Sequence, residues 1–115
     1  MTTLPSRTLS IRIERPCDEV YNFLTEPGSS AKWASGMDSS APVTSAEVNE
    51  FGVLDHTVHL PGQDVYVPMR VVRNGTGSEV LFTLFRLPDM DDAQYAADAE
   101  AVMKDLRKLK ELLEN

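Results

Sequence analysis

The first third of the chain shows the hydrophobic patterns of a strand followed by two short helices. Over residues 8–14, apolar side chains alternate with polar ones, which is the period of a half-buried β-strand. Pro16 suits a first helical turn, and apolar residues recur on one face after it, so we expect a short helix that ends before Pro27. Residues 30–33 are predicted to form one further helical turn.

The middle of the chain is predicted to form an antiparallel meander. Residues 36–46 have little periodicity and are expected to form a loop leading into an edge strand. Three β-rich runs follow at residues 53–60, 65–73 and 78–86, separated by short segments rich in Pro, Gly, Asn and Asp. Such segments are typical of tight turns between paired strands.

The C-terminal quarter carries the strongest pattern in the sequence. Asp91 or Asp92 can cap a helix whose apolar side chains step by four and three residues. This stripe consists of Tyr95, Ala99, Val102, Leu106, Leu109 and Leu113. A long helix with one apolar face is predicted, and we expect that face to lie across the sheet.

Short turns also predict the strand register. Pairing Leu60 with Val65 and Arg73 with Ser78 makes one sheet face apolar, except for an imidazole, His56. We therefore expect His56 under the long helix and largely shielded from water. Such a group can act as acid, base or hydrogen-bonding partner, or be an ordinary core histidine.

The opposite, outer sheet face combines charged and apolar side chains. The same register sets Asp55 across from Arg70, a cross-strand pair that we interpret as structural. The apolar residues predicted for this face are Val53, Tyr66, Val72, Leu81 and Phe85. Because apolar patches mark interfaces, we expect a homodimer through this face, unless residues 36–46 cover it.

Composition narrows the classes of protein. The 115 residues, 42% of them hydrophobic, predict a single domain over residues 1–115 with one core. One cysteine, Cys17, and the absence of a metal-ligand cluster predict no metal and no cofactor. The net charge of −7 argues against a nucleic-acid partner. The sequence shows neither a membrane span nor a signal peptide, so we expect a cytoplasmic protein with no membrane partner.

Several segments resemble the START-like, polyketide cyclase/dehydrase (SRPBCC) superfamily, in particular a small, uncharacterised branch. They are residues 10–13, 15–24, Trp33, 49–56, 67–72, 77–80 and 105–110. The resemblance implies the α+β helix-grip fold, with an antiparallel sheet curved around a long C-terminal helix and two short helices after the first strand. Only residues 37–48 are available for a hairpin that larger members carry, so we expect a fold lacking one hairpin.

The resemblance also implies a cleft between the sheet and the C-terminal helix. We expect it to bind a small hydrophobic or aromatic molecule, or a lipid. The predicted ligand-binding residues are Tyr21, Trp33, His56, Met69, Phe82, Leu84 and Met103. Two alternatives stay open: a cyclase- or dehydratase-like enzyme with His56 as acid or base, and a structural or interaction module with a collapsed cavity.

Overall fold

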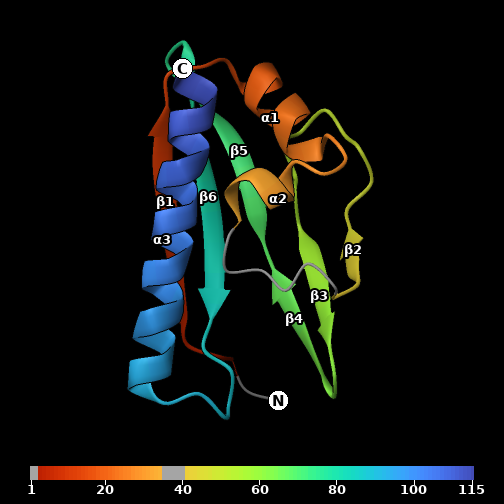
Figure 1. Cartoon of the computed structure of the whole chain (residues 1–115), viewed down its shortest axis with the longest axis vertical. Coiled ribbons are helices and arrows are strands. Elements are labelled where there is room, and N and C mark those ends of the chain that lie inside the picture. The colour runs from red at the N-terminus through yellow and green to blue at the C-terminus, as the bar shows by residue number, and fades with distance from the viewer. Residues whose placement is uncertain (1–2, 35–40) are drawn as a thin grey trace.

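The computed structural model describes residues 3–34 and 41–115, which form six strands and three helices (Figure 1). In chain order they are β1 (Ser6–Ile13), α1 (Cys17–Thr25), α2 (Ser30–Trp33), β2 (Val43–Ser45), β3 (His56–Leu60), β4 (Gln63–Val67), β5 (Met69–Asn74), β6 (Gly77–Phe85) and α3 (Asp92–Glu114). The predicted α+β class, the two short helices and the long C-terminal helix are confirmed.

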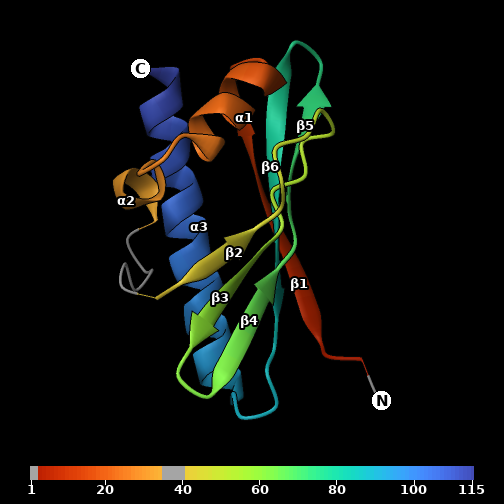
Figure 2. The ribbon, with the colours of Figure 1, turned by 90° about the vertical axis from the view of Figure 1, so that its right-hand side faces the viewer.

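The strands form two antiparallel, three-stranded sheets, in the orders β1-β6-β5 and β2-β3-β4. All three helices lie on the same side of these sheets (Figure 2). Helix α3 runs along β1 and β6, whereas α1 and α2 lie beside it over the upper part of the fold (Figure 1). The opposite side of the sheets carries no helix in the described part of the chain.

One predicted strand is interrupted at Pro68. The run over residues 65–73 forms two strands, β4 and β5, because proline has no N–H to donate to a neighbouring strand. Around this break, Leu54 N–H donates to Met69 O at 2.9 Å and Thr83 N–H donates to Pro68 O at 2.9 Å. These bonds connect the two sheets, so the strand layer bends at Pro68 without losing its continuity.

The register of the first hairpin differs from the prediction. Leu60 pairs with Gln63 rather than Val65, because the turn contains only Pro61 and Gly62. Gly62 has φ +74°, a left-handed conformation that glycine adopts without steric cost. The shift is two residues, so each side chain keeps its expected face. The second predicted register, with Arg73 opposite Ser78, is confirmed.

Asp55 holds the bend together. Its carboxylate accepts hydrogen bonds from Met69 N–H at 2.9 Å and from the Tyr66 hydroxyl at 3.2 Å, and it forms an ion pair with Arg70. Burial alone would raise the pKa of Asp55, but the hydrogen bonds from Met69 and Arg70 outweigh it and lower the pKa below its ordinary value. The structural interpretation of the Asp55–Arg70 pair fits this geometry, although Arg70 itself lies opposite Val53.

The predicted helical stripe packs into the core. Leu106 and Leu109 have no exposed surface, and Leu113 is 9% exposed. Asp91 caps α3, since its side chain accepts a hydrogen bond from Gln94 N–H at 2.8 Å. At the other end, Arg15 donates to Leu113 O at 2.9 Å. A side chain therefore pairs with terminal backbone groups at each end of α3.

The outer sheet face is partly as predicted. Tyr66 and Val72 are 51% and 41% exposed, and the Tyr66 ring stacks on Phe85 with a centroid distance of 6.4 Å. Leu81 is half-buried. Val53 forms an isolated bridge opposite Arg70, which agrees with its predicted sheet face, and it also borders the cavity described below.

Two expectations concern the segment between α2 and β3. Within the described residues this segment contributes one strand, the three-residue β2, which pairs with β3. Residues 35–40 lie outside the described residues, so the part of the 36–46 loop prediction that falls on them is not tested. The predicted edge strand is confirmed by β2.

Candidate functional site

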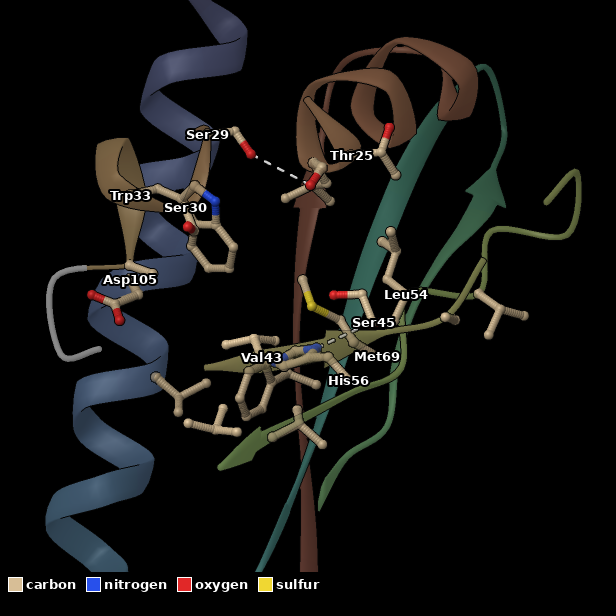
Figure 3. A pocket seen from close by; sticks show the side chains of 18 of the residues that line it. Thr25, Ser29, Ser30, Trp33, Val43, Ser45, Leu54, His56, Met69 and Asp105 are labelled. Atoms are coloured by element: carbon tan, nitrogen blue, oxygen red, sulfur yellow. Dashed lines mark hydrogen bonds between the residues drawn. The ribbon is translucent and has the colours of Figure 1, made fainter. Parts of the chain in front are cut away.

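A cavity of about 620 Å³ lies between the sheets and the helices (Figure 3). Its wall is formed by α1, α2 and the turn between them, by strands β2 to β6, and by the middle of α3. Ligand sites for drug-sized molecules have volumes of about 300–1,000 Å³. This volume argues against the alternative of a collapsed cavity.

Six of the seven predicted ligand-binding residues line this cavity: Tyr21, Trp33, His56, Met69, Phe82 and Leu84. The seventh, Met103, packs against the hydrophobic core instead. Helix α3 contributes Asp98, Ala101, Val102 and Asp105 to the wall. These four positions share one helical face, and Met103 lies about 100° away from Val102 around the axis. The binding role of all seven residues stays a prediction.

His56 lies at the helix-facing side of β3, the side that the alternation predicts. It is half-buried and not largely shielded as expected, because it borders the cavity. Its Nδ1 lies 3.0 Å from Leu54 O. A carbonyl oxygen only accepts, so Nδ1 carries the hydrogen and the neutral ring keeps a lone pair on Nε2. The edge contact with Phe82, at 6.5 Å between ring centroids, supports the ring from one side.

Trp33 supplies a second polar group. Its indole ring extends from α2 into the space between α2 and the sheet (Figure 3). The Nε1 atom is buried and has no hydrogen-bond acceptor among the described residues. A buried N–H without an acceptor costs about 1–3 kcal/mol.

The wall next to Tyr21 is held by Asn49. The Tyr21 hydroxyl accepts a hydrogen bond from Asn49 N–H at 2.9 Å, while the Asn49 side chain bonds to both Val53 N and Val53 O. These contacts tie the loop before β3 to α1. The cavity wall formed by Val53 and Leu54 is therefore set by specific hydrogen bonds as well as by packing.

Sequence reasoning missed the acidic part of the wall. Glu26 lines the cavity after α1, and Asp98 and Asp105 line it from α3. The two aspartates are seven residues apart and flank the apolar stripe, which places both on one helix face. The spacing can be read from the sequence, but it indicates a shared position in the cavity wall only when α3 is known to border the cavity.

Other candidate groups lie away from the cavity. Cys17 is half-buried, with its sulfur 4.0 Å from Gly77 O, as expected for a small packing residue. On the outer face, Thr44, His59 and Asp64 form a hydrogen-bonded row with distances of 2.7 and 2.9 Å. This row ties the edge strand β2 to the β3–β4 hairpin.

Within the described ranges, no helix has the length and hydropathy to cross a bilayer.

Comparisons with solved structures identify the fold. Protein MLL2253 from Mesorhizobium loti superposes with a TM-score of 0.76 at 18% identity, over 95% of this chain and 96% of that one. An AHSA1-like protein from Rhizobium etli gives 0.70 at 17% identity, over 99% and 86%. DynU16, from the dynemicin biosynthetic locus, gives 0.77 at 14% identity, over 96% of this chain and 47% of that one.

Comparison with protein-family models and with curated proteins gave no match. The AHSA1-like protein and DynU16 belong to the SRPBCC, polyketide cyclase-like superfamily. At these identities the likeness concerns the fold, and it agrees with the resemblance found in the sequence. The chain therefore has the helix-grip fold that these solved structures share.

Proposed function

We propose that the protein binds a small hydrophobic or aromatic molecule in the cavity between the sheets and α3. The observation that carries this proposal is the cavity of about 620 Å³, walled largely by aliphatic and aromatic side chains with a few polar groups. That combination is typical of small-molecule sites, where the apolar wall supplies affinity and the polar groups fix orientation. A cavity of this size left without a ligand would also forgo packing contacts.

The test is a fluorescence titration with N-phenyl-1-naphthylamine, a neutral aromatic probe. Saturable binding is expected, and Ala101→Trp should abolish it because Ala101 lines the cavity from α3. Ala96→Trp is the matched control, since Ala96 is exposed on the same helix and does not line the cavity. Absence of saturable binding, or equal binding by both variants, would overturn the proposal.

A second candidate function is acid–base catalysis on a polyketide-like carbonyl substrate. It is supported by His56, whose Nδ1 contact with Leu54 O leaves Nε2 as a proton acceptor at the cavity wall. Poly-β-ketone thioesters are suitable test substrates, with products followed by chromatography. Turnover that disappears in His56→Phe, while the variant still binds the fluorescent probe, would support catalysis; no turnover by the wild-type protein would reject it.

A further inference from the structure

Three polar side chains meet on the outer face of the sheet, away from the cavity. His59 Nε2 lies 2.7 Å from Thr44 Oγ1, and His59 Nδ1 lies 2.9 Å from Asp64 Oδ1. None of the three lines the cavity. A hydroxyl, an imidazole and a carboxylate in this order are the groups of a nucleophile, its general base and the acid that orients the base.

The strand pairing brings these side chains together. The short turn between β3 and β4 sets His59 directly opposite Asp64. Thr44 of β2 pairs with Thr57, two positions before His59, so Thr44 and His59 are diagonal neighbours on one face. Because His56 borders the cavity, His59 three positions later lies on the opposite side of the sheet.

Asp64 determines which ring nitrogen of His59 carries the hydrogen. An ionised carboxylate only accepts hydrogen bonds, so Nδ1–H donates to Asp64 and the neutral ring keeps a lone pair on Nε2. The Thr44 hydroxyl therefore donates to Nε2. In this arrangement an imidazole can remove the hydroxyl proton while the hydroxyl oxygen attacks an electrophile.

These side chains are accessible from solution. Thr44 is exposed, and the side chain of His59 is 38% exposed. Over the described ranges, no helix covers this side of the sheets (Figure 2). A small substrate can therefore reach the Thr44 oxygen without entering the cavity.

The backbone beside Thr44 offers a hydrogen-bond donor. Strand β2 is the outer strand in the order β2-β3-β4, and Ala46 N–H donates to Asp55 O, next to β3. Since N–H groups alternate in direction along an antiparallel strand, the N–H of Ser45 points to the edge away from β3. A backbone N–H of the residue after a nucleophile can stabilise the negative charge that develops on an attacked carbonyl oxygen.

We propose that Thr44 is a nucleophile that takes an acyl group from an activated ester on the outer face of the sheet. The hydroxyl proton passes to His59 Nε2 while the bond from Thr44 Oγ1 to the acyl carbon forms. When the ester C–O bond breaks, His59 returns the proton to the departing oxygen. The products are an acyl ester on Thr44 and the free alcohol of the substrate. This reaction does not depend on ligand binding in the cavity.

The test uses p-nitrophenyl acetate as the acyl donor. Absorbance follows the release of p-nitrophenolate, and peptide mapping by mass spectrometry should locate one acetyl group on Thr44. Thr44→Val should remove the fast release of p-nitrophenolate. His59→Gln should lower the rate of Thr44 acetylation about 100-fold or more, the contribution of a general base. Asp64→Asn should lower it at least about tenfold, because the amide no longer fixes the hydrogen on Nδ1.

Thr57→Val is the matched control. Thr57 carries the same side chain opposite Thr44 on the same face, and its replacement should leave the acetylation of Thr44 unchanged. The urea midpoint of each variant shows whether the protein remains folded.

Three outcomes would overturn the proposal: no acetylation of Thr44, equal acetylation of Thr44 in the wild-type and His59→Gln proteins, or an acetyl group on His59 that persists in Thr44→Val. The last would show that the imidazole itself attacks the ester. In each case the three side chains would serve only to link the strands.

Discussion

Gly52 is the position where the structure makes its sharpest prediction. It has φ +73°, and a Cβ built on it would lie 2.2 Å from Val71 O, far inside normal contact. Gly62 has nearly the same φ, +74°, but a Cβ there meets nothing within 4 Å. The pair Gly52→Ala and Gly62→Ala therefore separates the steric contact from the cost of the left-handed conformation.

The expected magnitudes follow from these contacts. Both variants bear a conformational cost of about 1–2 kcal/mol. Gly52→Ala must also push Val71 away and break the 3.0 Å hydrogen bond from Val71 N–H to Gly52 O. That bond alone is worth about 0.5–1.5 kcal/mol. With the added displacement of the β5 backbone, we expect Gly52→Ala to lose at least about 2 kcal/mol more than Gly62→Ala.

Urea denaturation measures this difference, with the fluorescence of Trp33 as the probe. For a slope of about 1–3 kcal/mol per molar urea, the two midpoints should differ by about 1 M or more. Gly52→Ala should also weaken ligand binding, because the segment after Gly52 holds Leu54 O, the acceptor that fixes His56. Equal midpoints for the two variants would refute the reasoning, since they would show that the close approach to Val71 costs nothing.

Three further predictions concern stability and assembly. Leu106→Ala should lose about 2–5 kcal/mol of unfolding free energy, whereas Leu112→Ala, 37% exposed on the same helix, should lose less than half of that in the same urea assay. The pKa of Asp55 lies below its ordinary 3.8, so the stability that Asp55 contributes is present above pH 3.8 and is lost as the pH falls through the lower folded-state value. In acid titrations, the unfolding free energy of Asp55→Asn should therefore fall less steeply with decreasing pH than that of the wild-type protein. We propose self-association through the outer sheet face, and sedimentation should show a dimer that Phe85→Lys dissociates, whereas a wild-type monomer at micromolar concentration would reject it.

Much of the fold was predictable because its signals are periodic. The step of four and three residues in α3 predicted the buried positions Leu106 and Leu109. Alternation in β3 predicted the face of His56 even though the register was wrong by two residues, because a shift by an even number leaves the face unchanged. Features that depend on a repeat therefore survive a local error in turn length.

The errors lie where the repeat breaks. Pro68 interrupts a run that otherwise alternates well, and its missing N–H was a readable signal for the break. The run predicted over residues 53–60 begins as a strand only at His56, because Val53, directly after the left-handed Gly52, forms an isolated bridge. The unpaired Trp33 N–H and the acidic cavity wall depend on contacts between distant elements, which no local pattern contains.

Side-chain size along α3 explains why the protein has both a closely packed core and a cavity. In its C-terminal half, Leu106, Leu109 and Leu113 fill the space against the sheet and are 0–9% exposed. Further toward its N-terminus the cavity wall is formed by Ala101 and Val102, whose shorter side chains leave room. The large core leucines and the small residues of the cavity wall thus lie largely in different parts of one helix. A large residue at Ala101 can fill the cavity while the leucines still hold the core, which is why Ala101→Trp tests binding without testing folding.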